Sequence, residues 1–216
     1  MLREKMELLR KKFTEGAGLV EAMLEAVEKA LSGAREGFIE EVRAYEDKIN
    51  QLENELDFYC TSIISLYGPE ARDLRTVLMI LKMNNELERV GDLLWGIAKS
   101  LRLIREKGSV VNLAPVTKLL SEAGKMFHSS INAFLQEDHA LAESILAQDD
   151  AVDEERSKMV RNYLMEMEKE PKQVESLYHL IKITQNAERI ADHATNISED
   201  VIYMVEGRNV KHHGND

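Results

Sequence analysis

The chain has 216 residues, of which 44% are hydrophobic and 31% charged, and its 39 acidic and 28 basic side chains give a formal net charge of −11. This composition is too apolar for a disordered chain and can supply the core of one ordinary domain or two small ones. The acidic excess disfavours direct binding to nucleic acid or anionic lipid, because like charges repel. We therefore expect cations and basic protein surfaces as partners, and no nucleic acid.

Neither a membrane span nor a signal peptide is predicted. No apolar run approaches the roughly 20 residues that a membrane helix needs, and the first residues carry charge without a following apolar segment. Cys60 is the single cysteine and cannot form an internal disulfide, which fits a reducing cytoplasm. We expect Cys60 to be buried and inert, and any work at a membrane to go through another protein.

Apolar residues recur at helical spacing through nearly the whole chain, and good helix formers such as Leu, Glu, Ala, Lys, Arg and Met are abundant. Glycine or proline marks most helix ends, and Asn112 is a candidate N-cap. The sequence therefore predicts an all-α protein. Its six predicted helices cover residues of about 4–31, 35–67, 69–107, 112–135, 137–170 and 171–205, with Gly207 closing the last.

The sequence repeats itself. Met23-Leu24 recurs 103 positions later as Met126-Phe127, and the segment LERVGD at 87–92 recurs 100 positions later as AERIAD at 187–192. The three-residue difference falls near the predicted turns at Gly68 and Pro171. We therefore predict two repeated three-helix bundles, arranged end to end with pseudo-twofold symmetry. The first repeat covers 1–109, the second 110–208, and a flexible tail 209–216.

A pair of acids stands out on the third helix. Glu88 and Asp92 are four residues apart, so they share one helix face, where like charges repel by about 0.2–0.5 kcal/mol. Apolar residues lie seven positions before and after Glu88, so the pair interrupts an apolar stripe. Glu188 and Asp192 repeat this arrangement on the sixth helix. A solvated helix face is the simpler interpretation of either pair alone, but the recurrence in both repeats favours a functional one.

The second and fifth helices add further acids. The second helix has a polar stripe at steps of four, three and four, formed by Glu46, Asn50, Glu53 and Asp57. In the second repeat, Asp149 and Asp153 take the positions of Glu46 and Asn50, whereas Arg156 takes that of Glu53. Acids gathered on facing helices are costly unless a positive group neutralises them. Either arginines such as Arg89 and Arg189 or a bound metal could do so, and hard oxygen ligands suit iron, manganese, magnesium or zinc.

Four segments resemble the PhoU family. The segments NELERVGD at 85–92 and NAERIADHATNI at 186–197 are similar to the two acidic signatures of that family. The segment PEARDLR at 69–75 resembles the family's opening of the third helix, and IYMVEGRNVKH at 202–212 resembles its C-terminal close. The similarity covers nearly the whole chain.

This resemblance implies two three-helix bundles whose acidic motifs hold multinuclear iron or zinc clusters. The metal ligands that it implies are Glu88, Asp92, Glu188 and Asp192, with Asp149, Asp153 and Glu46 matching less closely. Asn50 departs from the family pattern, because an aspartate completes the motif there, and this weakens the case for metal in the first repeat. Ala191 replaces the usual glycine, so we expect a slightly crowded helix contact there.

The resemblance also implies a function and partners. PhoU-like proteins act between a phosphate ABC transporter and a sensor histidine kinase, and repress the phosphate-starvation response. We accordingly expect a cytoplasmic negative regulator that reaches the inner membrane only through these protein partners. We expect no direct membrane insertion and no enzymatic activity, and we also expect a homodimer formed through helix faces.

Two other functions compete with this one. An accessory subunit of a secondary phosphate transporter would share the fold and the acids. A ferritin-like di-metal enzyme would need Glu-x-x-His pairs on two helices, and no glutamate in the chain is followed by histidine three positions later. We expect His193 to lie beside the acidic face as a hydrogen-bond partner.

Overall fold

The computed structural model describes residues 1–33, 36–108 and 110–206, and within these ranges all regular secondary structure is helical. The first repeat contains α1 (Leu2–Ser32), α2 (Phe38–Tyr67) and α3 (Ala71–Glu106). The second contains α4 (Ala114–Gln136), α5 (His139–Leu146), α6 (Asp149–Lys169), the 3₁₀ turn η1 (Pro171–Gln173) and α7 (Val174–Glu206). The predicted all-α fold of two repeated bundles is confirmed. Gly207 and the predicted tail 209–216 lie outside the described residues.

Local signals explain where several helices begin and end. Gly68 adopts the left-handed conformation, with φ 52°, and donates its backbone N–H to the Ile64 carbonyl, which closes α2. The Asp138 side chain caps α5 by accepting a hydrogen bond from the Leu141 N–H at 3.0 Å. Asn112, the predicted N-cap, lies one residue before the N-cap position of α4, and its Oδ1 accepts a hydrogen bond from the Ala114 N–H at the start of that helix.

The fifth predicted helix is wrong in one respect, because it is broken into α5 and α6. The backbone N–H of Gln148 donates to the Ile145 carbonyl at 2.9 Å, a tight last turn that ends α5. The Gln148 side chain donates to the Ser144 carbonyl, also at 2.9 Å, which satisfies another free end group of the helix. The break lets α5 pack against α4 and α7 while α6 continues along α7.

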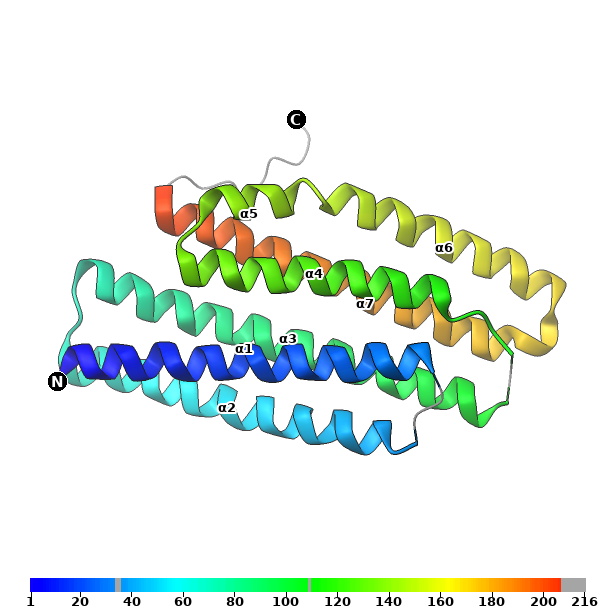
Figure 1. Cartoon of the computed structure of the whole chain (residues 1–216), viewed down its shortest axis with the longest axis horizontal. Coiled ribbons are helices and arrows are strands. Elements are labelled where there is room, and N and C mark those ends of the chain that lie inside the picture. Colours follow the sequence, from blue (N-terminus) through cyan, green and yellow to red (C-terminus); the bar gives the residue numbers. More distant parts are fainter. Residues whose placement is uncertain (34–35, 109, 207–216) are drawn as a thin grey trace.

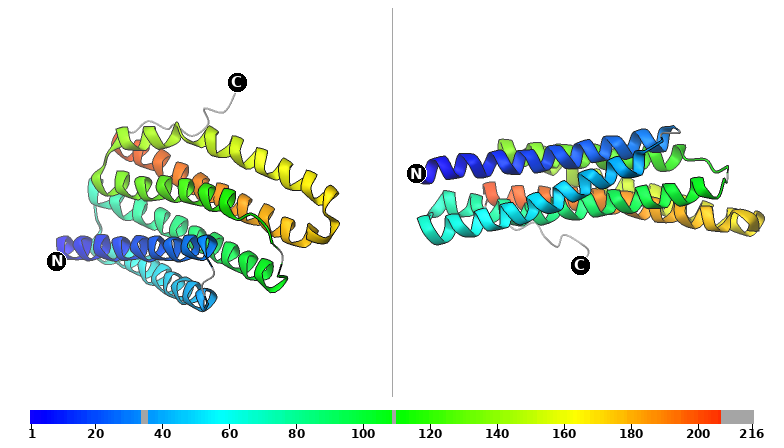
Figure 2. Two further views of the ribbon diagram at one scale, coloured as in Figure 1. Left: turned by 45° about the vertical axis from the view of Figure 1, so that its right-hand side comes forward. Right: turned by 90° about the horizontal axis from the view of Figure 1, so that it is seen from below.

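The two repeats lie side by side rather than end to end, which corrects the prediction. In Figure 1, α1, α2 and α3 form the lower half of the molecule and α4 to α7 the upper half, and the left view of Figure 2 shows the same two halves. Two helix pairs form the contact between the repeats: α3 packs against α7, and α1 packs against α4. The physical reason is that α3 and α7 each carry apolar side chains on two sides, so each needs a second covering layer.

Helix α3 is a clear case of burial on two sides. The Leu87 side chain reaches α1, where it would lie 3.3 Å from a Cβ placed on Gly16. On the side facing the second repeat, the Leu93 carbonyl accepts a hydrogen bond from the Asn186 side chain of α7 at 3.3 Å. Between α1 and α4, the rings of Phe13 and Phe134 meet edge to face with centroids 5.1 Å apart. The core is therefore continuous across the two repeats.

A polar seam runs between α3 and α7. The ring Nδ1 of His193 donates to the Glu86 carboxylate at 2.6 Å, and both side chains are largely buried. Burial alone would raise the pKa of Glu86, but the hydrogen bond and charge of His193, with help from Asn196 and Arg89, hold that pKa below its ordinary value. His193 is therefore a hydrogen-bond partner of an acid, as predicted. The acid is Glu86 between the repeats, however, not Glu88 on the predicted acidic face.

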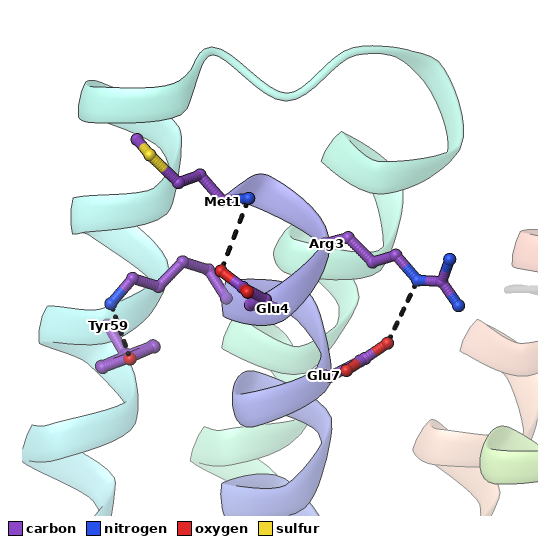
Figure 3. A network of polar contacts seen from close by, with 6 residues as sticks. Met1, Arg3, Glu4, Glu7 and Tyr59 are labelled. Atoms are coloured by element: carbon purple, nitrogen blue, oxygen red, sulfur yellow. Dashed lines mark hydrogen bonds and ion pairs between the residues drawn. The ribbon is translucent and has the colours of Figure 1, made fainter.

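The N-terminal end of α1 buries Met6 and Leu9 in the core, while its ion pairs lie at the surface. The Met1 amino group pairs with Glu4 and Arg3 with Glu7, at 3.5 and 3.2 Å, as the dashed lines in Figure 3 show. Exposed pairs of this kind stabilise a fold by about 0–1 kcal/mol. Two polar contacts reach α2, namely the hydrogen bond from Lys5 Nζ to the Tyr59 hydroxyl at 3.5 Å and the ion pair of Lys12 with Glu55 at 2.8 Å. Among residues 1–33, 36–108 and 110–206, no helix has the length and apolar character that a bilayer crossing requires.

The contact of α2 with α3 involves two positions at which the repeats differ. A Cβ placed on Gly91 would lie 3.3 Å from the Ile49 side chain, which is tighter than an ordinary contact. The equivalent residues of the second repeat are Val152 and Ala191, so one side chain is a methylene smaller where the other is a methyl larger. Val152 and Ala191 are both buried, and by analogy with the first repeat we expect the smaller valine to make room for the alanine.

We predict that Gly91→Ala and Ile49→Val are energetically coupled. The alanine improves helix propensity by up to about 1 kcal/mol but crowds Ile49. Gly91→Ala should therefore be more favourable in the Ile49→Val background than in the wild type, by about 0.5–1 kcal/mol in the free energy of unfolding. Urea denaturation of the four proteins of this double-mutant cycle measures the difference. Strict additivity would contradict the proposed packing.

Candidate functional site

Acids from α6 and α7 converge in the second repeat. Asp153, Glu188 and Asp192 each offer a carboxylate oxygen, and the three oxygens lie within 4.8 Å of one another. Glu188 and Asp192 are one turn apart on α7, and Asp153 faces them from α6, which packs alongside. Asp149 lies one turn before Asp153 and interacts electrostatically with both Asp153 and Glu188. We call Asp149, Asp153, Glu188 and Asp192 the second-repeat acids.

Burial and the charges of the second-repeat acids raise the pKa of two of their carboxyl groups, those of Asp192 and Asp149. Burial, followed by the charges of Glu188, Asp149 and Asp153, raises the pKa of Asp192 to about 6. Burial and then the charge of Asp153 also raise the pKa of Asp149. Like charges have thus been brought together without full compensation. Such a site favours a cation.

One cation of the chain already lies against this cluster. Arg156 on α6 donates from Nη2 to Glu188 Oε1 at 2.8 Å, and the side chains are 34% and 14% exposed. The hydrogen bond to Glu188 is the largest contribution that raises the pKa of Arg156, and the charges of Asp153 and Asp192 act in the same direction. The arginine that pairs with an acid of the site is therefore Arg156, which was not among the predicted counterions Arg89 and Arg189.

The acids of the first repeat form a looser group between α2 and α3. Burial, followed by the charges of Asp92 and Glu53, raises the pKa of Glu88. Burial and then the charges of Asp57 and Asp92 raise the pKa of Glu53. Asn84, which is buried, orients this side of α2 by donating to the Asp57 carboxylate and to the Glu53 carbonyl, both at 2.9 Å. We call Glu53, Asp57, Glu88 and Asp92 the first-repeat acids.

The structure brings most of the predicted metal ligands together, but not all of them. The structure brings Glu188, Asp192, Asp149 and Asp153 together in one repeat and Glu88 with Asp92 in the other. Glu46 instead accepts a hydrogen bond from Asn50 on its own helix at 3.2 Å. Glu53 and Asp57 were seen as part of the stripe but were not predicted as ligands. Their spacing of seven and eleven residues from Glu46, which keeps one helix face, is the signal that could have included them.

Both clusters have the donor chemistry of a hard-cation site. Their ligands are carboxylate oxygens without thiolate, which suits magnesium, manganese or iron better than zinc. The nearest histidine, His193, uses its Nδ1 on Glu86. Cys60 lies buried within α2, and burial raises the pKa of its thiol to about 12, so it is an unreactive core residue, as predicted.

Fold and site together define a duplicated helical-bundle protein with a cluster of carboxylates between two neighbouring helices of each repeat, α2 and α3 in the first and α6 and α7 in the second. Comparison with known proteins identifies the family. Residues 13–101 and 116–201 each match the model of the PhoU domain. The chain belongs to the PhoU family.

Individual members of the family are similar to this chain over nearly its full length. The phosphate-specific transport system accessory protein PhoU homolog of Pseudomonas aeruginosa is 34% identical over 97% of this chain and 87% of the relative. That of Aquifex aeolicus is 33% identical over 98% and 96%. A crystal structure of PhoU from Pseudomonas aeruginosa superimposes with a TM-score of 0.90 at 31% identity, covering 96% of this chain and 100% of that one. The family is thus one of transport accessory proteins, not of enzymes, as predicted.

We predict that ionised Asp192 destabilises the metal-free protein. Its pKa is raised from 3.8 to about 6, so the folded state binds the proton more tightly than the unfolded state does. The cost of ionisation is fully present above about pH 6 and disappears as the pH falls towards 4. Asp192→Asn should therefore be more stable than the wild type at pH 7, by about 1 kcal/mol after allowance for solvent screening of a half-buried group.

Urea denaturation in the presence of a chelator, at pH 7 and at pH 4.5, checks this prediction. The gain should shrink at the lower pH. Asp150→Asn, an exposed neighbour on α6, serves as the control and should change stability little at either pH. Equal stability of Asp192→Asn and wild type at pH 7 would show that the repulsion at this site is negligible.

Proposed function

We propose that the chain is a negative regulator of phosphate-starvation signalling that acts as an adaptor between a phosphate ABC transporter and a sensor histidine kinase. The observation that carries this proposal is the match of both repeats to the PhoU domain. It is supported by relatives, similar over nearly the whole chain, that are named accessory proteins of a phosphate-specific transport system. On this proposal the protein works in the cytoplasm and reaches the membrane through its partners.

The acid clusters supply a physical basis for docking. The chain has a net charge of −11, and carboxylates are concentrated where α2 meets α3 and where α6 meets α7. Such surfaces attract basic surfaces of a partner and increase the rate of encounter. They would also be the natural place for a bound cation to change which partner is favoured, because a divalent ion would cancel half or more of the local charge.

We further propose that these clusters bind a hard divalent metal. In the second repeat Asp153, Glu188 and Asp192 would hold it with Asp149 beside them, and in the first repeat Glu53, Glu88 and Asp92 would do so. The proposal includes iron, manganese or magnesium, singly or in a multinuclear cluster. Zinc is a poorer fit because thiolate and free imidazole ligands are lacking among the described residues of these clusters.

The signalling role is tested by the double variant Glu188→Gln/Asp192→Asn in a host lacking its own copy of the protein. These changes keep the shape of both side chains while removing two charges from the second-repeat acids. We expect derepression of a phosphate-starvation reporter in high phosphate, approaching the level of the deletion. The matched control is Asp150→Asn/Glu154→Gln, an exposed pair with the same spacing on α6, which should keep repression intact.

Normal repression by the Glu188→Gln/Asp192→Asn protein would refute a role of this cluster in signalling. Circular dichroism and thermal unfolding of the purified variant establish that it is folded. Derepression by the control variant as well would show instead that signalling depends on the overall charge of the groove.

Metal binding is tested by thermal unfolding of chelator-stripped protein with and without added Mn²⁺. A ligand that binds the folded state alone stabilises it by about 2.7 kcal/mol at a concentration of a hundred times Kd. The wild type should therefore show a rise in Tm that saturates with Mn²⁺. The rise should be reduced in Glu188→Gln/Asp192→Asn and retained in Asp150→Asn/Glu154→Gln. An identical rise in all three proteins would place the metal elsewhere.

A further inference from the structure

The two acid clusters are not equivalent, and one residue makes the difference. Arg156 on α6 and Glu53 on α2 occupy the same position of the repeat, 103 residues apart. In the first repeat, Glu53 adds a third negative charge beside Glu88 and Asp92. In the second repeat, Arg156 places a positive charge against Glu188. The two clusters thus differ by two units of charge at one position of an otherwise repeated scaffold.

The contacts of Arg156 show that it lies within the cluster rather than beside it. Its Nη2 is 2.8 Å from Glu188 Oε1, and Asp153 and Asp192 are close enough to act on its charge. These are the three acids whose oxygens converge within 4.8 Å. A cation at this place allows like charges to approach one another, because it offsets their repulsion. Among the residues that the structure describes, only this triad converges so closely, which agrees with the position of the arginine.

The arginine is incompletely satisfied where it lies. Its Nε is buried and has no hydrogen-bond partner among the described residues. A buried donor without a partner is unfavourable, so this pairing of Arg156 leaves part of its hydrogen-bonding capacity unused. The Arg156 side chain as a whole is about one third exposed, and a long arginine side chain can move towards solvent without a change in the helix. The contact is therefore suited to being exchanged for another cation.

We propose that Arg156 is a built-in counterion that occupies the second-repeat acid cluster in the metal-free protein and must leave Glu188 before a divalent metal can bind there. The inference rests on the proposed metal binding and deepens it by naming the residue that sets the affinity of one site. It follows that the second-repeat site binds metal more weakly than its acids alone would allow. The first repeat has Glu53 at the same position. Within residues 1–33, 36–108 and 110–206, no arginine or lysine forms a hydrogen bond or ion pair with Glu53, Glu88 or Asp92, and Arg89 acts on Glu88 only through its charge.

The test uses the full-length chain with the first-repeat site removed by Glu88→Gln/Asp92→Asn, so that binding reports on the second repeat. In this background, Arg156→Gln removes the competing charge while keeping a polar side chain of similar length. We expect its Mn²⁺ affinity, measured by the electron paramagnetic resonance signal of free Mn²⁺, to rise about tenfold. The matched control is Arg161→Gln, an exposed arginine of the same helix, which should leave the affinity unchanged.

A second measurement separates a counterion from an ordinary structural arginine. Without metal, Arg156→Gln should lower Tm, because the acids lose their partner. Saturating Mn²⁺ should restore Tm to the level of the metal-loaded parent. A Tm that remains low with metal bound would mean that Arg156 supports the fold and does not hold the place of the metal, which overturns the proposal.

The outcomes also distinguish this proposal from the proposed metal binding. If the parent binds Mn²⁺ and Glu188→Gln/Asp192→Asn abolishes binding, but Arg156→Gln leaves the affinity unchanged or weaker, the metal site stands and the role of Arg156 fails. If the parent binds no Mn²⁺ but Arg156→Gln does, the counterion role is established directly. If no variant binds Mn²⁺, even with the arginine removed, and the wild type with its first-repeat acids intact binds none either, both proposals fail.

Discussion

The antiparallel packing of α3 against α7 is the contact on which the rest of the structure depends. Both helices are buried on two sides, so they form the shared centre of the two repeats, and the remaining groove of each faces α2 or α6. As a result, acids that are close in the sequence of α3 lie on different sides of the helix. Glu86 and Glu88 are two residues apart and therefore project about 200° apart around the helix. Glu86 pairs with His193 inside the seam, whereas Glu88 joins the acids of the outer groove.

Duplication followed by local change explains how the repeats differ without losing the common fold. In the seam between α3 and α7, Glu86 of α3 pairs with His193 of α7. The equivalent positions of the other repeat are Asn186 and Leu93, where the Asn186 amide donates to the Leu93 carbonyl. The contact of α2 with α3 also differs from its counterpart in composition, because Gly91 lies against Ile49, whereas the equivalent residues of the second repeat are Ala191 and Val152. Paired changes of this kind preserve the packed volume and the hydrogen bonding, so the helix positions can stay alike.

The acid clusters are the part of the molecule that packing does not explain. Carboxylates that raise one another's pKa, as at Asp192 and Glu88, reduce the stability of the fold at neutral pH. Their recurrence in both repeats places this unfavourable charge at equivalent grooves of α3 and α7. Perturbed carboxylates of this kind are typical of functional sites, where a cation or a basic partner provides the missing compensation. Arg156 provides part of it in one repeat.

The sequence by itself determined the helices, the duplication and the shared face of Glu188 and Asp192, because periodicity, end signals and one-turn spacing are local properties of a chain. It did not reveal the break after Leu146, where no glycine or proline marks the end of a helix. Only the tertiary structure decided that the repeats lie side by side, that Arg156 meets Glu188 and that Glu46 stays with its own helix. The reason is physical: which helix faces meet depends on how apolar surfaces far apart in the chain are buried together, and a local pattern does not record that choice.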